Sequence, residues 1–133
     1  MHTLILIEPH AALRQSLHRW LALDLPPCAM LEANDVAHAV VLAAVQPPRA
    51  ILLDLDALSA DEQGAIWRLG QLCPQAAILG IGLDDTPAHR QRAELAGVTM
   101  FVSKAQLQTD LLRALQLELN SASSETQKPA TKN

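Results

Sequence analysis

Aromatic residues are almost absent from this sequence. They make up 2% of its 133 residues, with two Trp, one Phe and no Tyr, although half of all residues are hydrophobic. The core must therefore be built from Leu, Ile, Val and Ala. A chain of this length is long enough to bury one such core, so we expect a single main domain.

The sequence also lacks an excess of basic residues, a long apolar run and a cysteine motif. The formal net charge of -4 argues against a free-standing nucleic-acid-binding protein, because phosphate contacts need clustered Lys and Arg. No apolar run approaches membrane-spanning length, and a strand pattern begins almost at the first residue, which argues against a signal peptide. Cys28 and Cys73 lack CxxC spacing and fit buried thiols of a reduced, cytoplasmic protein.

The most informative stretch that is present runs from Ala50 to Asp56 and reads AILLDLD. Four consecutive apolar residues are typical of a strand buried on both faces of a parallel sheet. Asp54 then falls at the carboxyl end of that strand, at the edge where open α/β sheets bind ligands. We therefore take Asp54 as the leading candidate for a functional side chain.

Short apolar segments predict four further strands, at residues 3–7, 28–31, 76–82 and 98–102. Apolar residues at helical spacing predict a helix after each of the five strands. Asn34 or Asp35 is the expected N-cap of the second helix, and Ser59 or Asp61 that of the third. The expected inner face of the third helix consists of Ala65, Ile66, Leu69 and Leu72.

Strands that alternate with helices predict an α/β fold with a parallel sheet. Because crossovers are right-handed, we expect a doubly wound, flavodoxin-like sheet of five strands in the order 2-1-3-4-5, flanked by five helices. The last 14 residues, 120–133, are rich in Ser, Thr and Lys. We interpret residues 1–119 as the domain and residues 120–133 as a disordered tail or interdomain linker.

This topology would bring several functional groups to one edge of the sheet: Glu8, Asp54, Asp56, Gly82 and Lys104. Carboxylate oxygens are suitable ligands for Mg²⁺. An Asp carboxylate can act as a nucleophile and form an acyl phosphate. A lysine ammonium can pair with phosphoryl oxygens.

Together these residues resemble the receiver domain of bacterial two-component response regulators, the CheY-like family, over about residues 2–119. LLDLD matches the strand that carries the phosphoacceptor, here Asp54. Lys104, after Phe101-Val102-Ser103, matches the lysine that follows the fifth strand, and Ala96-Gly97 matches the step before it. The opening LILIEPHAALRQSL is similar to receivers attached to LuxR/NarL-type DNA-binding domains.

The resemblance implies a function in signal transduction rather than enzymatic turnover. A histidine kinase or phosphotransfer protein would phosphorylate Asp54, with Lys104 as a catalytic partner and Mg²⁺ held by Glu8, Asp54 and Asp56. Gly82 and Phe101 would occupy the switch positions. The change would be read out on the face of the fourth helix, fifth strand and fifth helix, through a homodimer or a DNA-binding output domain beyond residue 133 that regulates transcription.

Several positions depart from the family pattern. Pro9 replaces the second of two adjacent acids, which in the family is a principal metal ligand, and Glu8 replaces the first. Gly82 stands where the family has a Thr or Ser, Phe101 lacks a hydroxyl, and Ala105 replaces a Pro. An alternative role for Glu8 is to cap the first helix, where the dipole favours a carboxylate. For Asp56 we expect the backbone carbonyl rather than the side chain to contribute.

These departures support a second hypothesis, an atypical pseudo-receiver that dimerises or binds a protein without phosphorylation. A third, an enzyme of another flavodoxin-like class, is disfavoured. The first strand is not followed by a glycine-rich phosphate loop, and the sequence has no nucleophilic Ser or Cys in an elbow motif.

Overall fold

The computed structural model describes residues 2–58, 62–83 and 86–120, without the side chain of residue 63. It contains one parallel sheet in the order β2-β1-β3-β4-β5, which confirms the predicted topology. The strands are β1 (His2–Ile7), β2 (Cys28–Ala33), β3 (Ala50–Asp54), β4 (Ala77–Gly82) and β5 (Met100–Ser103). The proposed cap at Ser59 or Asp61 and the tail beyond residue 120 lie outside the described residues.

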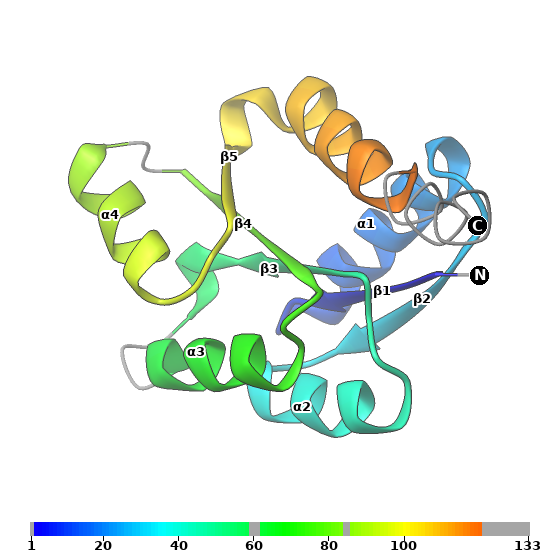
Figure 1. The fold of residues 1–133 in the computed structure, drawn as a ribbon. Coiled ribbons are helices and arrows are strands. Elements are labelled where there is room, and N and C mark those ends of the chain that lie inside the picture. The colour runs from blue at the N-terminus through cyan, green and yellow to red at the C-terminus, as the bar shows by residue number, and fades with distance from the viewer. Residues whose placement is uncertain (1, 59–61, 84–85, 121–133) are drawn as a thin grey trace, which may run out of the picture.

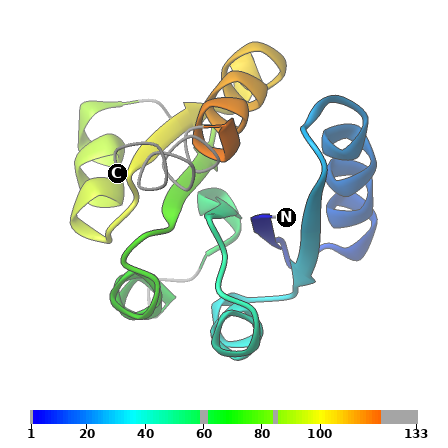
Figure 2. The ribbon, with the colours of Figure 1, turned by 45° about the vertical axis from the view of Figure 1, so that its right-hand side comes forward.

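Helices cover both faces of this sheet (Figures 1 and 2). They are α1 (Ala11–Asp24), α2 (Val36–Val45), α3 (Glu62–Leu72), α4 (Pro87–Leu95) and a C-terminal helix. The C-terminal helix begins with a π-helical turn, Leu107–Leu111, and continues as an α-helix over residues 112–120. Its α-helical part therefore includes Asn120, which we had assigned to the tail.

Local sequence explains where α2 and α4 begin and end. The Asp35 carboxylate accepts a hydrogen bond from His38 N at 2.8 Å and caps α2, as predicted. Thr86 caps α4 in the same way, and Pro87 fits the first turn because the missing N–H has no helical partner there. Gly97, with φ of 100°, then lets the chain turn out of α4 into β5.

Aliphatic residues form two core layers, one on each face of the sheet. Ile5, Ile51 and Ile78 point to one face, where α2, α3 and α4 pack against them. Leu4, Leu52 and Leu79, one residue away in each strand, point to the other face, under α1 and the C-terminal helix. Both faces of the central strands are thus buried, as the continuous apolar run in β3 predicts.

Three details of the sequence-based assignment were wrong. Leu72 is 62% exposed rather than inward-facing, because Cys73, one residue later, takes the buried position below α3. Strand β2 continues to Ala33 instead of ending at residue 31 as predicted, since β1 pairs with it along its whole length. Strand β5 begins at Met100 rather than Val98, because Val98 N donates instead to the carbonyl of Ala93 at the end of α4.

Two further sequence-based expectations can be compared with the structure. Both cysteines are free; Cys73 is buried, as predicted, whereas Cys28 is only half-buried. Burial raises the pKa of each thiol. Of the helices in the described part of the chain, none combines the length and apolar character needed to cross a membrane.

Candidate functional site

The strand register brings the predicted site residues to one edge of the sheet. Leu53 in β3 pairs with Ile7 in β1, so that Glu8 and Asp54 follow on adjacent strands. Gly82, the last residue of β4, pairs with Ser103 in β5, and Lys104 comes next. The topology alone therefore gathers side chains that are distant in the sequence, such as Asp54 and Lys104, which lie 50 residues apart.

Asp54 and Lys104 form the centre of the site. The Lys104 ammonium lies 3.0 Å from Asp54 Oδ1 and 3.1 Å from Oδ2, nearly equidistant from the two oxygens. Asp54 Oδ1 also accepts a hydrogen bond from Asp56 N at 3.0 Å. The Asp54 side chain is 6% exposed and that of Lys104 is 25% exposed. A nearly buried carboxylate is thus held beside a cation at the mouth of the site.

Asp56 takes part through its side chain, contrary to our expectation of a backbone contact. Its Oδ2 lies 3.0 Å from the Lys104 ammonium and accepts a hydrogen bond from Leu83 N at 2.8 Å. The side chain is turned inward because Lys104 and the backbone after β4 both offer donors there. Lys104 therefore bridges two carboxylates rather than one.

The pKa values of this group reflect that bridge. Burial alone would lower the pKa of Lys104, but hydrogen bonds and charge interactions with Asp54 and Asp56 outweigh it, and the pKa is raised. For Asp56, burial would raise the pKa, but hydrogen bonds from Lys104 and Leu83 N, with the charges of Lys104 and His89, lower it. The ammonium and the Asp56 carboxylate are therefore both charged at neutral pH.

Glu8 is directed away from this bridge. Its side chain is 1% exposed, and its Oε2 accepts a hydrogen bond from His10 N at 3.1 Å, just before α1. His10 Nδ1 lies 3.4 Å from the same oxygen. The second oxygen, Oε1, is buried without a hydrogen-bond partner. In this conformation the Glu8 carboxylate accepts a backbone hydrogen bond at the start of α1, which corresponds to the alternative role described for it above.

The donors at this edge suit Mg²⁺ in chemical type but not in arrangement. Across residues 2–58, 62–83 and 86–120, no three His, Cys, Asp or Glu side chains are placed to hold a metal ion together. Glu8 is turned toward His10, and the Lys104 ammonium lies between Asp54 and Asp56. The residues therefore do not fit a resident ion in this conformation, and Mg²⁺ binding by Glu8, Asp54 and Asp56 stays a prediction.

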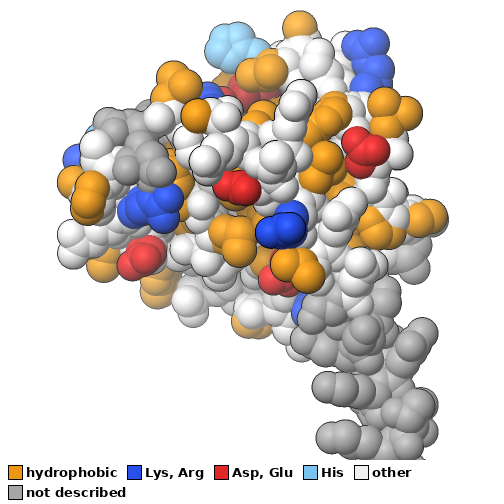
Figure 3. Space-filling view, turned by 90° about the horizontal axis from the view of Figure 1, so that it is seen from above, with side chains coloured by type: hydrophobic (Ala, Val, Ile, Leu, Met, Phe, Trp, Pro, Cys, Tyr) orange, Lys and Arg blue, Asp and Glu red, His pale blue; other side chains and the backbone are white. Residues whose placement is uncertain are grey.

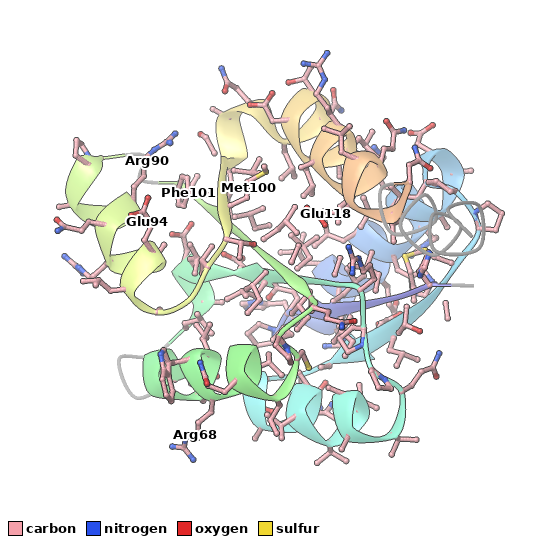
Figure 4. All side chains as sticks on the ribbon, viewed as in Figure 1. Arg68, Arg90, Glu94, Met100, Phe101 and Glu118 are labelled. Atoms are coloured by element: carbon pink, nitrogen blue, oxygen red, sulfur yellow. The ribbon has the colours of Figure 1, made fainter. Side chains whose placement is uncertain are left out.

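Gly82 and Phe101, at the two switch positions, contact one another. A Cβ atom on Gly82 would lie 3.1 Å from Cε2 of the Phe101 ring and 3.5 Å from Asp56 Oδ1. The guanidinium of Arg90 lies over the ring, 5.3 Å from its centroid, and Figure 4 shows both side chains in the space between α4 and β5. The half-buried ring thus occupies space that a side chain at position 82 would need.

Among the described residues, two cavities border side chains of the acidic edge. The smaller, of about 120 Å³, is bordered by Pro9, Asp35, Asp54 and Glu62. The larger, of about 250 Å³, lies under α4 and reaches Asp56, Gly82 and Phe101. The sequence analysis missed the larger one. The signal in the sequence was α4 itself, whose buried positions carry alanine instead of large aliphatic residues.

The fold is shared with response-regulator receiver domains of known structure. A LuxR-family two-component response regulator from Aurantimonas sp. matches with a TM-score of 0.77 and 24% identity, over 91% of this chain and 86% of that one. A CheY-like receiver domain protein from Methanospirillum hungatei also has a TM-score of 0.77, with 13% identity over 94% of this chain and 98% of that one.

A third similar structure has a different description. It is a putative pilus assembly protein from Burkholderia thailandensis, with a TM-score of 0.74 and 21% identity over 93% of this chain and 99% of that one. The sequence itself matches no protein-family model and no curated protein. At these identities the comparisons establish the CheY-like fold, and the function has to be argued from the site.

Proposed function

We propose that this chain is a receiver module of a two-component signalling system, in which Asp54 accepts a phosphoryl group. The observation that carries the proposal is the contact between the nearly buried Asp54 carboxylate and the Lys104 ammonium, at 3.0 Å. Lys104 follows β5 and lies 50 residues from Asp54 in the sequence. An acid with no function at the end of a strand would not require such a partner. In this position Lys104 can pair with the new charge when a phosphoryl group arrives.

The proposed reaction is a single phosphoryl transfer. An oxygen of Asp54 forms a bond to phosphorus while the P–N bond of a phosphohistidine in the kinase or phosphotransfer protein breaks. The released imidazole takes up a proton. Lys104 then moves its hydrogen bonds from the carboxylate to the phosphoryl oxygens, and this frees Asp56 to rearrange with the Leu83 backbone.

Labelling with a small phosphodonor tests this step. We expect phosphoramidate, in buffer with Mg²⁺, to add one phosphoryl group to the whole chain, seen by intact-mass spectrometry and removed by hydroxylamine. The Asp54→Asn variant should stay unlabelled. Asp110→Asn, which changes an exposed acid on another element, should be labelled like the wild type. No labelling of the wild type, or equal labelling of Asp54→Asn, would overturn the assignment.

The proposed output surface is the face of α4, β5 and the C-terminal helix. Met100 is 46% exposed on this face, and Leu117 is exposed on the C-terminal helix. Seen from above, where β5 ends and the C-terminal helix runs, hydrophobic side chains are interspersed with acidic and basic ones (Figure 3). Mixed surfaces of this kind are typical of reversible interfaces, so a phosphorylation-dependent homodimer or an output domain fits better than an obligate oligomer.

The full proposal places the chain in the cytoplasm, with a histidine kinase upstream and transcription regulation downstream. The likeness to a LuxR-family two-component response regulator supports transcription regulation as the output. In this proposal a DNA-binding output domain follows the receiver. The proposal treats the chain as a signalling module and not as an enzyme with its own substrate.

A second candidate function is a pseudo-receiver that binds a partner without phosphorylation. Two observations favour it: Glu8 is bonded to His10 rather than facing Asp54, and Phe101 already occupies the space beside Gly82. The same fold is found in a protein described as a putative pilus assembly protein. Dimerisation or partner binding that is identical in the wild type and in Asp54→Asn would favour this candidate over the first.

A further inference from the structure

Helix α4 is unusually poor in core residues. The side of α4 that borders the cavity carries His89, Arg92, Ala93 and, just beyond the end of the helix, Ala96, at the spacing of three and four residues that places side chains on one side of a helix. The two alanines are buried, whereas His89 and Arg92 are exposed at the rim. Ala93 is the buried residue of this helix. The buried positions on this side carry Ala rather than Leu or Ile, so α4 does not fill the space between itself and the sheet.

The result is the cavity of about 250 Å³ beneath α4. Its apolar wall comes from four elements, and the wall residues are Leu55, Leu58, Ile66, Ala93 and Phe101. An apolar cavity of roughly 150 Å³ is enough to bind benzene. The cavity under α4 can therefore hold one aromatic ring and a short side chain in contact with Phe101.

The charges at the rim favour an anion. Arg92 and His89 border the cavity from α4. The Arg92 side chain is exposed at this rim, where a bound anion can reach its guanidinium. One acid, Asp56, also borders the cavity, but its carboxylate is already paired with Lys104 and Leu83 N.

We propose that this cavity binds a small aromatic carboxylate, with its ring among Leu58, Ile66 and Phe101 and its carboxylate on Arg92. Such a ligand would touch Phe101 and Gly82, and Gly82 lies beside Asp56, which is paired with Lys104. Ligand occupancy would then be a second input to the same switch. The proposal does not depend on phosphorylation of Asp54, because binding can be measured without any phosphodonor.

A titration of the ¹⁵N-labelled full chain with phenylacetate tests the proposal. We expect saturable amide shifts at Gly82, Ala93, Ala96 and Phe101. Acetate, which lacks the ring, should give none. Neutral phenylacetamide should bind about tenfold more weakly, because a hydrogen bond to a charged group contributes roughly 1.5–3 kcal/mol and 1.4 kcal/mol is a factor of ten.

Three variants separate the parts of the site. Arg92→Gln should weaken phenylacetate binding about tenfold by the same argument. Arg113→Gln, a matched change on the C-terminal helix, should leave it unchanged. Ala93→Leu should fill the cavity and abolish the shifts. If that variant does not fold, the result for Arg92→Gln still tests whether the carboxylate binds at Arg92.

Three outcomes would overturn the proposal. The first is the absence of saturable shifts with phenylacetate. The second is equal binding of phenylacetate by Arg92→Gln and the wild type. The third is a set of shifts at these amides that appears only when the protein concentration is raised, because it would assign the cavity to contact with a second copy.

Discussion

Replacing Pro9 with Asp is expected to raise the affinity for Mg²⁺ by at least about tenfold, equivalent to about 1.4 kcal/mol. Pro9 is exposed and borders the same cavity of about 120 Å³ that Asp54 borders. A carboxylate at position 9 would therefore border the cavity that Asp54 also borders, which has room for water. Mg²⁺ keeps several of its waters and needs one or two carboxylates, which this variant would provide.

The control for this prediction is Pro9→Ala, which removes the proline ring without adding a charge. Mg²⁺ titrations followed by the amide signals of Asp54 and its neighbours should show weak, millimolar binding for the wild type and for Pro9→Ala, and tighter binding for Pro9→Asp alone. Equal gains in the two variants would show that backbone freedom matters rather than the carboxylate. An unchanged affinity in Pro9→Asp would mean that Glu8 or Lys104, not Pro9, limits metal binding.

Replacing Lys104 with Met should destabilise the fold by about 1–3 kcal/mol near neutral pH, since removing one partner of a buried ion pair leaves an uncompensated charge. The ammonium lies within 3.1 Å of Asp54 and 3.0 Å of Asp56, so two carboxylates would lose their shared cation. We place the effect below that of a fully buried pair because the Asp56 side chain is 35% exposed and partly screened by solvent.

The pH dependence of this loss follows from the pKa shifts. The pKa of Asp56 is lowered below its ordinary value of 3.8, so its contribution is present above pH 3.8 and is lost as the pH falls through the lower, folded-state pKa. The pKa of Lys104 is raised above 10.5, so its contribution is complete below that pH and is lost as the pH rises through the folded-state pKa. The loss of unfolding free energy in Lys104→Met should therefore be largest at intermediate pH and become smaller at both acidic and strongly basic pH.

Urea unfolding at several pH values measures this deficit, with Lys104→Arg as the charge-conserving control. A deficit that does not change between neutral and acidic pH would show that Lys104 stabilises through packing of its aliphatic stem rather than through its charge.

The sequence was most informative about features that depend on the order of elements. The apolar run before Asp54 identified a central strand, and the alternation of strands and helices predicted the strand order. These two features were enough to predict that Asp54 and Lys104 lie at the same edge of the sheet. Topology decides which strand ends are neighbours, and chain order is enough to infer it.

Side-chain directions could not be inferred in this way. Asp56 faces Lys104 and Glu8 faces His10 because of donors that three-dimensional packing brings near them. The cavity under α4 likewise depends on how far the helix stands from β5, and small or basic residues on one helix do not determine that distance. These details depend on local competition for hydrogen bonds and space, which residue spacing does not encode.

The central claim is that the Asp54–Lys104 pair receives a phosphoryl group, and beryllofluoride, a mimic of the aspartyl phosphate, tests it most directly. Amide NMR spectra would be recorded in Mg²⁺ before and after its addition, for the wild type and for Asp54→Asn. We predict shifts at Asp54, Gly82 and Lys104 that extend to Phe101 and α4 and are absent from the variant. Unchanged wild-type spectra at millimolar Mg²⁺ would contradict the claim and leave the phosphorylation-independent module as the better account.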